Sequence, residues 1–97
     1  MAKILFIDDD THTLSLMEQI ALIVGHEAVL CPAAKDAQRI AVESRPDLLM
    51  IDINMQDVSG FDVVKHMRNN EITTKTPIII LSYSEPDFEE EKAINAV

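Results

Sequence analysis

Residues 47–52, with the sequence DLLMID, decide the fold class of this chain. Four apolar side chains in a row leave no polar face, so the segment fits a strand that is covered on both sides. Strands of this kind are typical of parallel sheets, whose two faces are packed with helices. The run ends in a carboxylate, Asp52, at the carboxyl end of the predicted strand.

Short apolar runs and helical patterns alternate along the whole chain. Further strands are predicted at 3–7, 27–31 and 77–82. Helical spacing predicts helices at 11–24 and 34–44, a third after Gly60, and a fourth that begins at Ser84-Glu85-Pro86. We therefore expect residues 1–97 to form a single α/β domain, in which a doubly wound parallel sheet is built from four βα units.

The first predicted helix has both end signals and an apolar face. Thr11 or Thr13 is expected to cap its start, and Gly25 follows its end in the usual position for a glycine stop. Its expected inward-facing stripe consists of Leu14, Met17, Ile20, Ala21 and Val24.

The 97-residue chain is strongly acidic, with 17 acids, 8 bases and a formal net charge of −9. Such a surface repels nucleic acid and anionic lipid, so neither is an expected partner, whereas cations and basic protein faces are favoured. No apolar run is long enough for a membrane helix. The single cysteine, Cys31, cannot form an internal disulfide, which fits a reducing cytoplasm.

Polar side chains follow three of the predicted strands. Asp8, Asp9 and Asp10 come after the first strand, Asp52 ends the third, and Ser82 ends the fourth. Ligands of parallel sheets bind outside the carboxyl ends of the strands, and converging carboxylates need protonation, a base or a metal. Oxygen ligands without a cysteine or histidine pair favour Mg²⁺, Mn²⁺ or Ca²⁺, and the sequence predicts a site for such an ion here.

Three blocks carry a family resemblance: FIDDD at 6–10, DINM at 52–55 with Gly60 following, and ILS at 80–82. In order and spacing they resemble the receiver domain of bacterial two-component response regulators. The resemblance implies a flavodoxin-like fold with strand order 2-1-3-4-5. It also implies a cytoplasmic signalling domain rather than an enzyme.

The resemblance implies a role for each matching position. Asp8, Asp9 and Asp52 would hold Mg²⁺ or Mn²⁺, with Asp9 a more direct ligand than Asp8, and the backbone carbonyl of Asn54 would complete the metal shell. Asp52 would accept a phosphoryl group from a sensor histidine kinase or a phosphotransfer protein. The hydroxyl of Ser82 would then move toward that group, and the altered surface would contact a downstream protein target. Asp10 occupies a position that need not be acidic and is expected only to cap a helix.

The chain departs from the family at three places. Gln56 replaces the usual proline, which is expected to loosen the loop, and Tyr83 replaces a small residue beside the phosphoacceptor. The chain ends at Val97, before the family's fifth strand, its lysine and its fifth helix. No lysine of this chain is therefore expected to contact the phosphoryl group. We expect either a homodimer or higher assembly that covers the edge of the fourth strand, or a piece of a longer protein.

Two other functions fit parts of the pattern. A receiver-fold docking module without productive phosphorylation would explain the missing lysine and Tyr83. A phosphatase of the haloacid dehalogenase type also uses an aspartate at a strand end, but its opening motif does not match Thr11 and His12.

Overall fold

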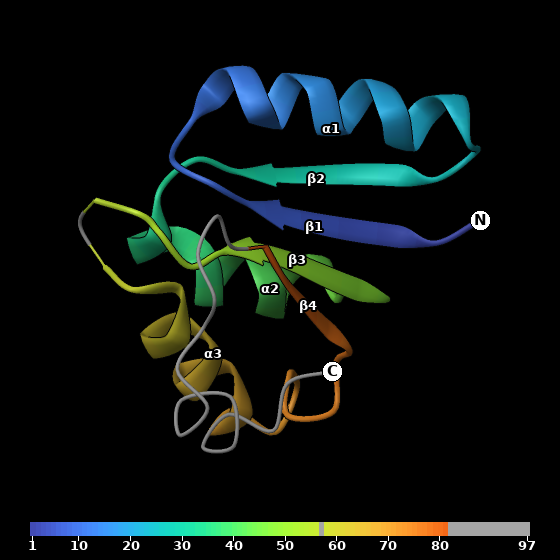
Figure 1. The fold of residues 1–97 in the computed structure, drawn as a ribbon. Coiled ribbons are helices and arrows are strands. Elements are labelled where there is room, and N and C mark those ends of the chain that lie inside the picture. The colour runs from blue at the N-terminus through green and yellow to red at the C-terminus, as the bar shows by residue number, and fades with distance from the viewer. Residues whose placement is uncertain (57, 82–97) are drawn as a thin grey trace.

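The computed structural model describes residues 1–56 and 58–81. These residues form a four-stranded parallel sheet with helices on both faces (Figure 1). The strand order is β2-β1-β3-β4. The strands are β1 (Lys3–Ile7), β2 (Glu27–Cys31), β3 (Leu48–Asp52) and β4 (Ile78–Leu81). This is the flavodoxin-like arrangement, and the predicted fold class is confirmed.

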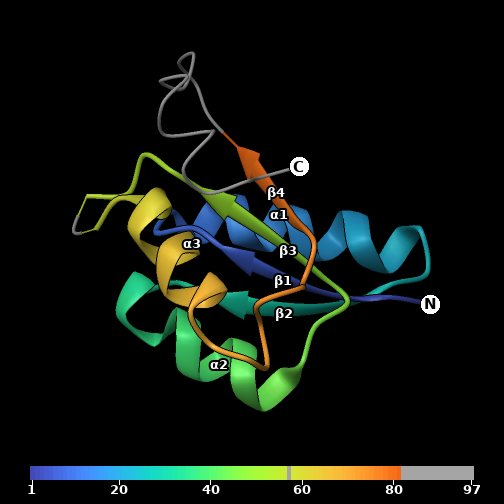
Figure 2. The same cartoon turned by 90° about the horizontal axis from the view of Figure 1, so that it is seen from below.

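The helices follow the predicted alternation in the described part of the chain. They are α1 (Thr11–Ile23), α2 (Ala37–Ser44) and α3 (Gly60–Arg68), and a 3₁₀ helix, η1 (Ala34–Asp36), leads into α2. α1 lies on one face of the sheet, and α2 and α3 lie on the other (Figures 1 and 2). The predicted fourth helix and Ser82 lie outside the described residues. None of the described helices has the length and apolar character needed to cross a bilayer.

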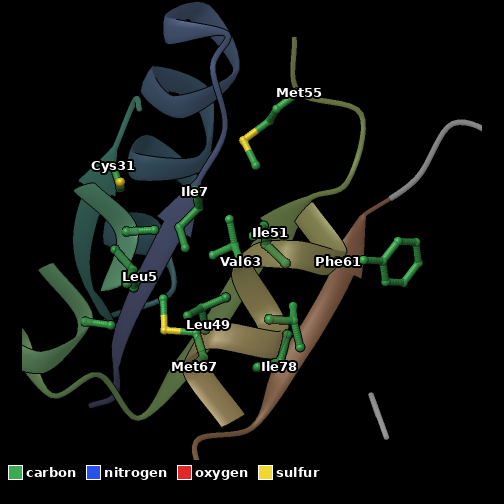
Figure 3. Packing of buried hydrophobic residues seen from close by; sticks show 13 residues of the cluster. Leu5, Ile7, Cys31, Leu49, Ile51, Met55, Phe61, Val63, Met67 and Ile78 are labelled. Atoms are coloured by element: carbon green, nitrogen blue, oxygen red, sulfur yellow. The ribbon is translucent and has the colours of Figure 1, made fainter. Parts of the chain in front are cut away.

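The larger core lies between the sheet and the pair α2 and α3. Alternate residues of β1 and β3 point to this side and meet the inner face of α3 (Figure 3). The fully or nearly fully buried members include Leu5, Ile7, Leu49, Ile51, Val64, Met67 and Ile78. The apolar runs of β1 and β3 are thus explained, because each strand has a covered face on both sides.

The core on the α1 side is smaller, and part of the predicted stripe lies outside it. Leu14 and Ala21 are buried against the sheet, but Ile20 is 48% and Val24 61% exposed. At 3.6 residues per turn, Ile20 lies about 120° around the helix from Leu14, beyond the face that the sheet covers. The prediction that Ile20 faces inward is wrong for this reason, and the prediction for Val24 is wrong because Val24 is the C-cap, after the last residue of α1.

The ends of the helices show which local signals were correct. Gly25 follows α1 with φ = 85°, a left-handed conformation that suits glycine, as predicted. The cap of α1 is Asp10, not Thr11 or Thr13, because its carboxylate accepts a hydrogen bond from the His12 N–H. The Thr13 hydroxyl donates to the same carboxylate. Asp10 lies one residue before Thr11 and three before Thr13, and each of its two oxygens accepts one of these hydrogen bonds.

Gly60 brings the start of α3 against the end of β3. A Cβ at this position would lie 2.6 Å from Ile53 Cα and 2.7 Å from the Asp52 carbonyl oxygen. Both are backbone atoms, so a side chain could fit only if α3 moved away from the strand that ends in Asp52.

We therefore predict that Gly60→Ala destabilises the fold by about 1–3 kcal/mol, the usual cost of overpacking. For a domain of this size the thermal midpoint would fall by roughly 4–8 °C per kcal/mol. Gly25→Asn is the control, because no atom lies within 4 Å of a Cβ there and asparagine tolerates the left-handed conformation. Equal midpoints for the two variants, measured by circular dichroism, would contradict the close packing.

Candidate metal and phosphoacceptor site

Strand pairing brings Asp8 next to Asp52. β1 and β3 are neighbours in the sheet, and Ile7 pairs with Ile51 in the parallel register. The next residue of each chain segment is an aspartate, so the two carboxylates emerge at the same edge of the sheet. Asp9 follows Asp8 in the loop that leads to α1.

The three carboxylates form a compact cluster. One oxygen from each of Asp8, Asp9 and Asp52 lies within 4.8 Å of the other two. Asp8 is 7% and Asp52 6% exposed, whereas Asp9 is exposed. The cluster therefore has two carboxylates at its floor and one at its solvent side. It brings together the three aspartates that were predicted to hold a cation.

Each carboxylate of the cluster accepts one hydrogen bond from a backbone N–H. The Asp10 N–H donates to Asp8 Oδ1 at 2.9 Å, and the Asn54 N–H donates to Asp52 Oδ1 at 2.9 Å. The third bond runs between distant parts of the chain, from the Gln56 N–H to Asp9 Oδ2 at 3.0 Å. No lysine or arginine forms an ion pair with these carboxylates among the salt bridges of the described residues.

The environment disfavours the charged form of Asp8. Burial raises the pKa of its carboxyl, and the negative charges of Asp52, Asp9 and Asp10 raise it further. The hydrogen bond from the Asp10 N–H acts in the opposite direction but does not compensate. The charged form of the Asp8 carboxyl is therefore destabilised, and a bound cation would stabilise it.

Asp10 has a different role from its neighbours. It lies outside the three-carboxylate cluster, and its side chain serves the start of α1. The hydrogen bonds from the Thr13 hydroxyl and the His12 N–H lower its pKa, which keeps it charged. This matches the expectation that Asp10 is a cap rather than a ligand.

The cluster fits a small hard cation. Mg²⁺ binds oxygen at 2.0–2.1 Å, so two oxygens on one ion are at most about 4.2 Å apart. Three oxygens cannot all lie opposite one another, and neighbouring oxygens of an octahedral ion are about 3 Å apart, so oxygens up to 4.8 Å apart must approach by as much as about 2 Å through rotation of the carboxylate side chains. Carboxylate oxygens without a sulfur or imidazole donor suit Mg²⁺ and Mn²⁺.

Of the remaining predicted site residues, Asn54 lies in the described part of the structure. Asn54 is exposed and lies in the turn after Asp52, bonded through its N–H to the Asp52 carboxylate. Ser82 and Tyr83 lie outside the described residues. The sequence motif includes Gly60 but does not indicate its close contact with β3. The contribution of the Gln56 N–H was not predicted, because no sequence signal indicates which backbone N–H reaches Asp9.

Comparisons with known proteins show the family of the chain. Residues 4–97 match the family described as the response regulator receiver domain. The chain is 32% identical over 82 residues to the DNA-binding dual master transcriptional regulator RpaA of Synechocystis, covering 84% of this chain and 34% of RpaA. It is 32% identical over 80 residues to the transcriptional regulatory protein PrrA of Mycobacterium tuberculosis, covering 82% of this chain and 34% of PrrA. The chain thus spans about a third of the length of these curated relatives.

A solved structure gives the same result at the level of the fold. The chemotaxis protein CheY4 of Vibrio cholerae superposes with a TM-score of 0.92 at 28% identity. The superposition covers 99% of this chain and 82% of CheY4. From the family match, the strand order and the shared fold, the chain belongs to the response regulator receiver domain family.

Proposed function

We propose that this receiver domain accepts a phosphoryl group on Asp52 from a sensor histidine kinase or a phosphotransfer protein, and that it does so with Mg²⁺ or Mn²⁺. The observation that carries the proposal is the cluster of Asp8, Asp9 and Asp52, with oxygens within 4.8 Å of one another. A site with this much negative charge cannot receive an anionic phosphoryl group unless a cation is present. The role of the domain would be signalling in the cytoplasm, with residues 1–97 acting as one domain.

In the proposed reaction a carboxylate oxygen of Asp52 attacks phosphorus, and the P–N bond to the donor imidazole breaks as the P–O bond forms. The imidazole nitrogen keeps the electron pair of the broken bond. The Asn54 N–H holds Asp52 Oδ1, which limits rotation of the nucleophile. Burial of Asp52 keeps competing water away from one side of it. The bound ion would supply charge neutralisation between the carboxylate and the phosphoryl oxygens.

The ion would be held in this proposal by Asp8, Asp9, Asp52 and the backbone carbonyl of Asn54. Ser82 would then contact the phosphoryl group, and the resulting change of surface would be recognised by a downstream protein target. Contact with nucleic acid or a membrane is not part of the proposed role of residues 1–97, because the net charge of −9 opposes both.

The phosphoacceptor role predicts a covalent product at a single residue. With Mg²⁺ and a small phosphodonor such as acetyl phosphate, the parent chain should gain one phosphoryl group by intact mass, and Asp52→Asn should gain none. Asp62→Asn is the matched control, because Asp62 is an exposed carboxylate in the first turn of α3, outside the cluster. If the parent chain gains no mass and binds no beryllofluoride, the docking-module alternative replaces the proposal.

Charge repulsion within the cluster predicts a stabilising substitution. Asp8→Asn keeps the oxygen that accepts the Asp10 N–H but removes one charge. Two unit charges 4 Å apart cost about 1 kcal/mol even in water, so the variant should melt several degrees above the parent at pH 7 in EDTA. Added Mg²⁺ should raise the midpoint of the parent more than that of the variant.

The pH dependence of this difference has a definite sign. Because the pKa of Asp8 is raised in the folded protein, its contribution to stability is most favourable at low pH and is lost as the pH rises through the folded pKa. The advantage of Asp8→Asn should therefore shrink as the pH is lowered below that value. A constant advantage down to pH 3 in thermal melts would contradict the repulsion.

We also propose that β4 takes part in a homodimer or higher assembly. β4 is the outer strand of the sheet that the described residues form, and Ile79 on it is 40% exposed. An apolar side chain on an outer strand favours pairing with a second chain, and a lysine there opposes it.

Sedimentation velocity tests this assembly. The parent chain should sediment as a dimer or larger species at tens of micromolar, and Ile79→Lys should shift it to the monomer. Ile72→Lys is the control, because Ile72 has the same 40% exposure but lies outside the strand. A monomeric parent chain would contradict the proposed assembly.

A further inference from the structure

The hydrogen bond between Gln56 and Asp9 joins two segments that are far apart in the chain. The Gln56 N–H donates to Asp9 Oδ2 at 3.0 Å, and the two residues are 47 positions apart. One segment follows β3 and the other follows β1. The bond therefore ties the loop after Asp52 to the loop that carries Asp8 and Asp9.

Asp9 depends on this bond more than the other two carboxylates do. Asp8 and Asp52 are buried and held by the surrounding structure, whereas Asp9 is exposed. An exposed side chain without a fixed partner samples several rotamers, and ordering it costs conformational entropy. The Gln56 N–H selects the position in which Asp9 lies beside Asp8 and Asp52.

The donor is the backbone N–H of residue 56, so the identity of the side chain matters mainly in whether the residue is proline. Every residue except proline supplies an N–H. From the sequence alone, glutamine in place of proline at position 56 is expected to loosen the loop. The hydrogen bond indicates the opposite for the metal site, because only a residue with an N–H can hold Asp9 in this way.

We propose that Gln56 is a positioning residue for the cation site and acts through its backbone N–H. This inference rests on the proposed function. The N–H keeps the Asp9 carboxylate beside Asp8 and Asp52 before the ion binds, so that binding does not have to order it. The same bond couples ion binding to the loop between Asp52 and Gly60, because the loop and the ion share one carboxylate.

Mg²⁺ titration calorimetry of the full 97-residue chain tests the proposal. Gln56→Ala removes the side chain and keeps the N–H, so its Kd should stay within about twofold of the parent. Gln56→Pro removes the N–H, and its Kd should rise by about three- to tenfold, the net value of one hydrogen bond. Circular dichroism of both variants establishes that each is folded.

A second measurement needs no variant. Amide hydrogen exchange at Gln56, followed by NMR, should be slow both without Mg²⁺ and at saturating Mg²⁺, because the bond persists in both states. Exchange as fast as that of an unbonded amide in either state would overturn the proposal. This measurement decides the question if Gln56→Pro does not fold.

These outcomes distinguish a failure of the proposed function from a failure of the proposed role of Gln56. A parent chain that binds no Mg²⁺ contradicts the proposed function itself. A parent chain that binds Mg²⁺, together with a folded Gln56→Pro variant of equal or higher affinity, contradicts only the role of Gln56. A Gln56→Ala variant that loses as much affinity as Gln56→Pro would move the role from the backbone to the side chain and would also overturn the proposal.

Discussion

The repulsion among three carboxylates is the constraint on which the candidate site depends. Asp8 and Asp52 cannot separate, because the strands that carry them are hydrogen-bonded neighbours and each is packed on both faces. The stability of the sheet thus keeps the two carboxylates close together, whereas in a flexible chain their repulsion would drive them apart. A protein generally tolerates such an arrangement where a ligand or an ion makes use of it.

The parts of the fold that could be predicted are those encoded by local pattern. Each strand is a short apolar run, and the two-sided burial of β3 follows from four apolar residues in succession. The proximity of the aspartates at the strand ends could be predicted, because the carboxyl ends of parallel strands share one edge of the sheet. This explains why Asp8, Asp9 and Asp52 were identified from the sequence and lie together in the structure.

The parts that could not be predicted depend on tertiary geometry. The apolar character of Ile20 and Val24 says nothing about how much of α1 the sheet covers. The sequence indicates three candidate caps, Asp10, Thr11 and Thr13, and the choice among them depends on where α1 starts after β1. The bond to Asp9 comes from a backbone N–H, and a residue name carries no information about the direction of its backbone.

Asp10 connects the acidic cluster to the start of α1. Its N–H holds Asp8, while its side chain receives two donors from the opening turn of α1. One residue thus connects the floor of the acidic cluster to the end of a 13-residue helix. A displacement of Asp8 would therefore act on the N-terminal turn of α1 through the backbone and side chain of Asp10.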